Sequence, residues 1–231
     1  MRYELVSFDL DGTLVDTAAE IAEAANRTLD AHGIARRSAA EITLLIGAGT
    51  RELMLNLLAR CCLDDANLAS RVRADDVLAS LDEHYALTAG SSALAYGGCH
   101  EALADLKRGG VKLVCTTNKE LRHAQRVLKA TRLDGHFDLV IGGDSLPEKK
   151  PHASVLRHVA AQLGVPTSRC AHLGDSAVDV AAARNAGMAA WAVPYGYNAG
   201  APIEASQPDR LFQNLQQVAE HVLVGHRRVL T

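Results

Sequence analysis

The sequence predicts an α/β protein with a Rossmann-like, mainly parallel sheet core and an inserted helical cap. Three observations favour this fold class. Short apolar runs of strand type alternate with helix-like segments over the second half of the chain, as in a parallel sheet covered by helices. Polar clusters directly follow several of these runs. Finally, about a hundred residues separate the first apolar run from the second, where a βα connection usually needs only a few.

The strands and helices of the predicted core follow from local patterns. Apolar runs bounded by turn residues predict strands at 5–10, 111–115, 139–141, 170–173 and 189–193. Apolar residues at helical spacing predict helices at 120–131 and 153–163, and a segment rich in helix formers predicts a third at 177–186. Gly109, Gly110 and Gly187 follow helical stretches and mark plausible helix ends.

The long interval after the first strand is helical in pattern and has no convincing alternation of period two. Its clearest helical pieces are residues 18–32 and 51–60. We therefore expect residues 17–87 to form a helical cap inserted after the first strand, with residues 1–16 and 88–231 forming the α/β core. The alternative is that these helices simply coat the sheet.

Composition narrows the class of protein. The 231 residues are 48% hydrophobic, which allows a packed core, and the net charge of -3 mixes both signs along the chain. A nucleic-acid-binding protein would normally show a concentrated basic patch. No apolar stretch approaches the length of a membrane span. Five cysteines without a Cys-x-x-Cys pair favour reduced thiols, and we expect a soluble cytoplasmic protein with no nucleic-acid or membrane partner.

Two carboxylates, Asp9 and Asp11, stand at the end of the first predicted strand, in Phe-Asp-Leu-Asp-Gly-Thr. Ligands of open α/β sheets gather beyond the carboxyl ends of the strands. Two acids there repel each other unless a cation or proton compensates. Such a pair can divide the work between a nucleophile and a proton donor and acceptor. Taken alone, the motif favours an ordinary Asp-Gly turn, which Gly12 would allow.

A second acidic pair, Asp175 and Asp179, follows the strand predicted at 170–173 and leads into a helix. Residues four apart share one helical face. Carboxylates gathered at the edge of a sheet suit a hard cation such as Mg²⁺. Capping of the helix N-terminus is the alternative, and it accounts for one of the two acids better than for both.

Two further strand ends carry groups that suit a phosphate. Thr117 and Asn118 follow the strand predicted at 111–115 and offer hydroxyl and backbone donors. Lys149 and Lys150 precede Pro151 after the strand predicted at 139–141, and offer a point charge. Each motif alone is also compatible with a plain polar loop.

The ordered set resembles the haloacid dehalogenase superfamily of phosphohydrolases over nearly the whole chain, because Asp-x-Asp-Gly-Thr-Leu-x-Asp and Gly-Asp-Ser-x-x-Asp match two of its motifs. The resemblance implies that Asp9 attacks phosphorus and that Asp11 protonates the leaving oxygen and activates water. It implies that Thr117, Asn118 and Lys150 hold the phosphoryl group. It further implies Mg²⁺ bound by Asp9, the Asp11 carbonyl and Asp175, with Asp179 ordering the metal and its waters.

Within the superfamily, the chain looks most like the phosphoglycolate phosphatase branch, through Thr-Asn-Lys at 117–119 and Leu-Pro-Glu-Lys-Lys-Pro at 146–151. Asp11 argues against a dehalogenase, and the absence of lysine before Lys107 argues against a phosphonate-cleaving Schiff base. The resemblance implies a Mg²⁺-dependent phosphatase acting on a small phosphorylated substrate, 2-phosphoglycolate, through an aspartyl-phosphate.

The chemistry is better determined by the sequence than the substrate is. The alternatives are an acidic amino-sugar 6-phosphate or other sugar phosphatase, a β-phosphoglucomutase-like phosphotransferase, and a phosphate-binding module without turnover. Arg36, Arg37 and Arg51 in the predicted cap keep the mutase open. Gly49 and Arg51 are candidates for substrate specificity, with Arg51 facing a substrate carboxylate. A solvent-exposed Arg51 at a helix start is the alternative. The sequence does not report the oligomeric state.

Overall fold

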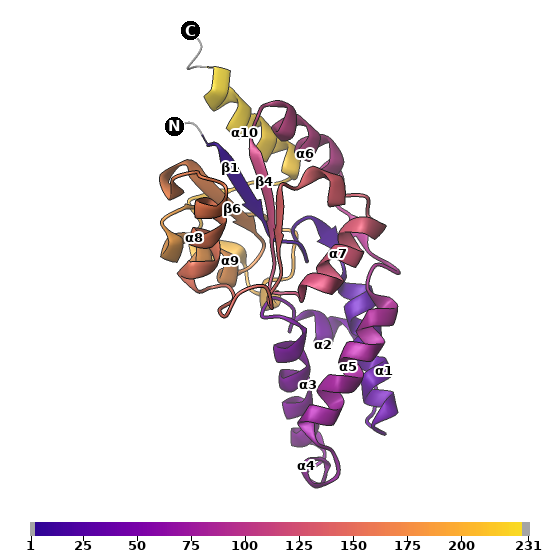
Figure 1. Cartoon of the computed structure of the whole chain (residues 1–231). Coiled ribbons are helices and arrows are strands. Elements are labelled where there is room, and N and C mark those ends of the chain that lie inside the picture. Colours follow the sequence, from indigo (N-terminus) through magenta and orange to yellow (C-terminus); the bar gives the residue numbers. More distant parts are fainter. Residues whose placement is uncertain (1–2, 228–231) are drawn as a thin grey trace.

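The computed structural model describes residues 3–227 and contains a six-stranded sheet in the order β5-β4-β1-β6-β7-β8, with every neighbouring pair parallel (Figure 1). The predicted parallel core is therefore confirmed. All five predicted strands are present within one or two residues of their expected bounds, and β8 was not predicted. The strands are β1 Leu5–Phe8, β4 Lys112–Thr116, β5 Leu139–Ile141, β6 Cys170–Gly174, β7 Ala189–Ala192 and β8 Arg210–Leu211.

Helices cover both faces of this sheet because successive strand residues point to opposite sides. In β1, Val6 packs into one buried cluster, with side chains from α6, α7 and α10, and Leu5 packs into the other, with side chains from α8 and α9. All three helices predicted for the core are present, and α9 has the predicted bounds. The helices are α6 Cys99–Arg108, α7 Leu121–Ala130, α8 Ala153–Gln162, α9 Ala177–Ala186 and α10 Leu215–Arg227.

The five helices between β2 (Val15–Asp16) and β3 (Leu94–Ala95) form a layer beyond the carboxyl ends of the strands of the main sheet (Figure 1). Their apolar side chains make a buried cluster of their own, in which α1 packs along α5. The division of the chain at residues 17 and 87 into core and cap stays a prediction. The helices are α1 Ala18–Ala31, α2 Ala39–Thr43, α3 Thr50–Asp64, α4 Leu68–Arg71 and α5 Ala74–Thr88.

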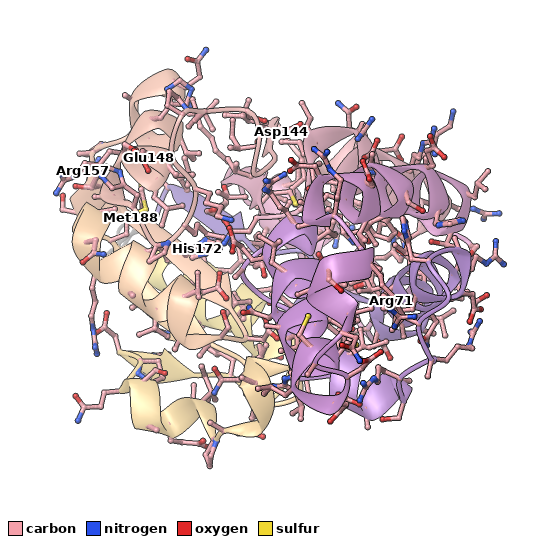
Figure 2. All side chains as sticks on the ribbon, turned by 90° about the horizontal axis from the view of Figure 1, so that it is seen from below. Arg71, Asp144, Glu148, Arg157, His172 and Met188 are labelled. Atoms are coloured by element: carbon pink, nitrogen blue, oxygen red, sulfur yellow. The ribbon has the colours of Figure 1, made fainter. Side chains whose placement is uncertain are left out.

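Two short segments connect this helical layer to the core. β2 (Val15–Asp16) and β3 (Leu94–Ala95) pair antiparallel and bring the outgoing and returning chain together. Strands of two residues are too short to show a period, which is why the sequence did not predict them. Figure 2, seen from below, labels Arg71 among the purple helices of this layer and Arg157 at the outer side of the core.

The state of the cysteines and the lengths of the helices can be compared with the expectations from the sequence. All five cysteines are free thiols; Cys62 is half-buried and the other four are buried. No helix within residues 3–227 combines the length and the apolar character needed to cross a membrane.

Candidate active site

The four polar clusters predicted at strand ends meet at one edge of the sheet. β1 lies between β4 and β6, so Asp9 at the end of β1 is flanked by the loops that carry Thr117 and Asp175. Asp9, Asp11, Thr117 and Asn118 line a single cavity between the core and the helical layer. Lys150, Asp175 and Asp179 are buried. All seven predicted catalytic, phosphate-binding and metal-ligating residues are thus brought to this edge.

Lys150 is the centre of a buried ionic network. Its Nζ lies 2.9 Å from Asp9 Oδ1 and 2.7 Å from Asp179 Oδ1, and it donates to the Thr116 carbonyl at 2.6 Å. Burial lowers the pKa of Lys150, but Asp179 and Asp9 more than offset this, so the pKa lies above the usual value for lysine. The ammonium is therefore charged and fixed directly beside Asp9.

The Asp175 carboxylate lies directly against the backbone of the loop that follows β1. Its Oδ2 accepts a hydrogen bond from the Tyr197 N–H at 2.6 Å, and its Oδ1 accepts one from the Thr13 hydroxyl at 3.3 Å. Gly12 has φ +81°, and a Cβ there would lie 2.3 Å from Asp175 Oδ2. Glycine at this position therefore serves both the turn and the fit of the carboxylate.

The carboxylate groups fit a divalent cation. Ligand oxygens of Asp9, Asp175 and Asp179 lie within 4.8 Å of one another, and the Lys150 ammonium pairs with two of these acids, Asp9 and Asp179. Three carboxylates and one ammonium leave two uncompensated negative charges, which a bound Mg²⁺ would balance. The buried Asp9 Oδ1 accepts no hydrogen bond of good geometry within the described residues. These observations support a metal site at Asp9 and Asp175.

The pKa shifts agree with this charge imbalance. Burial raises the pKa of Asp9 to about 7, although Lys150 acts in the opposite direction. Burial, reinforced by the charges of Asp179 and Asp9, raises the pKa of Asp175 well above its usual range. Burial also acts to raise the pKa of Asp179, but Lys150 and His172 outweigh it and hold that pKa below its usual range. Two of the three acids therefore require a proton or a cation.

Asp179 differs from the other acids because both of its oxygens are occupied by protein donors. Oδ1 faces Lys150 and His172, and Oδ2 accepts from the Ser176 N–H at 3.2 Å and from its hydroxyl at 2.6 Å. Ser176 and Asp179 form a capping box at the start of α9. Helix capping, the alternative weighed from the sequence, is therefore present at Asp179, together with the ion pair to Lys150.

A second layer of polar side chains, not identified from the sequence, supports Asp179. His172 on β6 is completely buried in the core (Figure 2), with Nε2 3.2 Å from Asp179 Oδ1 and Nδ1 3.0 Å from Ser7 Oγ. Ser7 Oγ in turn bonds Thr116 Oγ1 at 2.9 Å. Burial lowers the pKa of His172. The polar residues at inward positions of β1, β4 and β6 were the available signal for this layer.

Lys119, like His172, had no role predicted from the sequence. It is 2% exposed, and its Nζ donates to Asp11 Oδ1 at 2.6 Å. The Thr17 hydroxyl donates to the same oxygen at 2.6 Å. The Lys119 ammonium also lies 5.1 Å from the centre of the Tyr85 ring, at the end of α5. Asp11 is thus held between the core and the helical layer.

The loop before α3 closes the cavity from the side of the helical layer. Asn118 Nδ2 donates to the Gly47 carbonyl at 3.2 Å, and Lys149 Nζ donates to the Ala48 carbonyl at 2.9 Å. The Thr50 hydroxyl bonds the Glu120 carboxylate at 2.7 Å. Gly49 lines the cavity with φ +100°, and a Cβ there would lie 2.9 Å from the Asn118 carbonyl oxygen. Only glycine permits this approach without a shift.

The three arginines considered for the helical layer do not line this cavity. Arg51 is exposed and lines a separate cavity with Glu120 and His123. Arg36 pairs with Glu23 and Asp30 on the outer surface. Arg37 pairs with Asp64. Of the two specificity candidates, Gly49 is therefore at the cavity beside Asp9, whereas Arg51 is not.

Comparisons with known proteins agree with this geometry. A family model described as haloacid dehalogenase-like hydrolase matches residues 3–187. A Cupriavidus necator protein named "Phosphoglycolate phosphatase, plasmid" is 39% identical, covering 91% of this chain and 89% of its own. The phosphoglycolate phosphatase of Vibrio parahaemolyticus is 33% identical, covering 96% and 97%.

A solved structure extends the agreement to the three-dimensional fold. The crystal structure of a predicted phosphoglycolate phosphatase from Haemophilus somnus superimposes with a TM-score of 0.87 at 29% identity, covering 96% of this chain and 98% of the other. The family match spans more than half of the chain and includes all the acids of the site. The chain belongs to the haloacid dehalogenase-like hydrolase family.

Proposed function

We propose that this hydrolase is a Mg²⁺-dependent phosphatase that cleaves 2-phosphoglycolate through an aspartyl-phosphate on Asp9. The observation that carries the proposal is the position of Asp9. Its carboxylate lines the cavity between the core and the helical layer, 2.9 Å from the buried Lys150 ammonium. A second carboxylate, Asp11, lines the same cavity. Phosphoryl transfer requires mainly the positioning of a nucleophile and the neutralisation of charge.

The roles of the side chains follow from their contacts. Asp9 forms the bond to phosphorus as the ester oxygen leaves, and Asp11 gives that oxygen a proton and later takes one from water. Thr117 and Asn118 line the cavity next to Asp9 and offer donors to the phosphoryl oxygens. Lys150 adds the positive charge. Thr17 and Lys119 hold Asp11 in place.

Asp9, the Asp11 carbonyl and Asp175 would hold Mg²⁺. Asp179 would orient the Lys150 side chain and the metal-bound waters. When bound, the ion supplies positive charge to the phosphoryl oxygens and to the carboxylates. The saturated oxygens of Asp179 support an indirect role for it.

The choice of substrate rests on the named relatives and on the cavity. Both curated relatives described above are phosphoglycolate phosphatases. From the helical layer, the cavity receives mainly apolar side chains and glycine backbone, which suits a small acid better than a sugar with many hydroxyl groups. A mutase must bind a second phosphate, and none of the three arginines that kept this alternative open from the sequence lines the cavity. The side chains from that layer are Ile21, Ile46, Thr50 and Leu53.

We further propose that residues 17–87 act as a cap that admits substrate and excludes bulk water. Three hydrogen bonds from Asn118, Lys149 and Thr50 join the loop before α3 to the core, which supports a closed state. A cytoplasmic location is supported by the five free thiols, which suit a reducing compartment.

A panel of phosphate esters assayed with Mg²⁺ and with EDTA tests the function. We expect Mg²⁺-dependent phosphate release from 2-phosphoglycolate, no release by Asp9→Asn, and a phosphate adduct on the Asp9 peptide of the parent after acid quenching. Bisphosphate-dependent isomerisation of a hexose phosphate without phosphate release would indicate a mutase. Binding of inorganic phosphate without any turnover would indicate a binding module.

A further inference from the structure

Lys119 stands out among the residues around the cavity by its charge. Among the described residues that line the cavity at Asp9, it is the one cationic side chain. Lysine is rarely buried without a partner, and here it is 2% exposed. Its ammonium has three N–H groups, and the described part of the chain accepts one of them, at Asp11. Two donors therefore remain for a molecule in the cavity.

The opposite side of the cavity is also positive in character. α3 begins at Thr50, and Thr50 and Leu53 of its first turn line the cavity with Gly49. No side chain caps this end, and the first intrahelical bond at its start runs from the Leu53 N–H to the Gly49 carbonyl. The earlier N–H groups of the first turn are left for a ligand, and the helix dipole adds partial positive charge there.

We propose that Lys119, together with the start of α3, binds a carboxylate on the substrate and makes the enzyme select phosphate esters that carry one. This inference rests on the proposed function, because it names the residue that binds the carboxylate of the same substrate whose phosphate reacts at Asp9. It assigns to Lys119 the role that the sequence suggested for Arg51. Lys119 lies at the cavity and is buried, whereas Arg51 is exposed and lines the neighbouring cavity.

The contacts of Asp11 make this role compatible with catalysis. Lys119 and Thr17 both donate to Asp11 Oδ1, so Asp11 keeps a donor when the ammonium turns toward the substrate. The Lys119 side chain is buried and its Nζ lies over the Tyr85 ring, which limits the positions that Nζ can take. A bound carboxylate would share the ammonium with Asp11 beside the reacting phosphate.

The experiment compares 2-phosphoglycolate with ethyl phosphate, an ester of the same length without the carboxylate. We expect the parent to prefer 2-phosphoglycolate in kcat/KM, and Lys119→Met to reduce that preference about 10- to 150-fold, the value of a charge-assisted hydrogen bond. Any effect of the change on Asp11 acts on both esters and cancels in the ratio. Lys119→Arg keeps the charge and should recover part of the preference.

Matched variants separate the possible outcomes. Lys129→Met removes an exposed lysine of α7 and should leave the ratio unchanged. If Lys119→Met does not fold, Lys119→Gln provides the same test with a polar side chain. An equal loss on both esters, or a collapse of the ratio in Arg51→Ala instead, would overturn the assignment while leaving the phosphatase function intact. A parent without any ester hydrolysis would overturn both.

Discussion

Replacing Lys150 by methionine tests the central electrostatic feature of the site. The substitution keeps the apolar stem and the approximate volume but removes the ammonium that pairs with Asp9 and Asp179, beside Asp175 in the same carboxylate cluster. All four residues are at least nine-tenths buried. Removing one partner of a buried ion pair usually costs about 3–5 kcal/mol, because the remaining charge loses its compensation.

The contacts of Lys150 indicate where in this range the loss of folding free energy should fall. The pKa of Asp9 is raised to about 7, so at neutral pH this carboxyl can take up a proton at little cost when Lys150 is removed. The free energy of unfolding decreases mainly because the Asp179 carboxylate loses a partner, since the low pKa of Asp179 depends on Lys150 and His172. We therefore expect Lys150→Met to lower the free energy of unfolding by about 3 kcal/mol, the lower end of that range. For a chain of this size, such a loss lowers Tm by roughly 6–12 °C.

Thermal and urea denaturation of the parent, Lys150→Met and Lys129→Met would be measured in EDTA and in Mg²⁺. The exposed Lys129 serves as the control, and its removal should change the free energy of unfolding by less than about 0.5 kcal/mol. Mg²⁺ should narrow the gap between Lys150→Met and the parent, since a cation compensates the same carboxylates. An unchanged Tm of Lys150→Met in EDTA would refute the argument that Lys150 compensates these charges.

Three further predictions concern the layers around Asp9. His172→Phe removes hydrogen bonds to Asp179 and Ser7 and should lower the free energy of unfolding by about 1–3 kcal/mol, measured by urea denaturation; no change would mean that His172 does not support Asp179. Gly49→Ala should reduce kcat/KM more than Gly47→Ala does, because both have positive φ but only the Cβ at 49 meets the Asn118 carbonyl; equal kinetic effects would contradict this reason. Because the pKa of Asp9 is raised in the folded state, that carboxyl's contribution to folding is lost as pH rises from about 4 through about 7. The increase in Tm caused by Mg²⁺ should therefore grow over this range, and an increase independent of pH would show that the acids do not need the cation.

Local patterns in the sequence specify the strands and helices of the core and the polar groups that follow them. Alternating apolar runs and helical patterns are local properties, so the strands at 139–141 and 170–174 and the helix at 177–186 were predictable within a residue. Parallel strands also end at one edge of a sheet. For this reason, polar motifs at successive strand ends were enough to predict that Asp9, Thr117, Lys150 and Asp175 meet.

Which charges face one another depends on how the chain folds in three dimensions. From the sequence, Arg51 was the candidate partner for a substrate anion and Lys119 had no assigned role, whereas burial and cavity lining favour Lys119. His172 was invisible as a support for Asp179, because its contacts cross from β6 to β1 and to the start of α9. A local pattern can mark polar residues at inward positions of the strands, but the contacts between them depend on the register of neighbouring strands and on the packing of the helical layer.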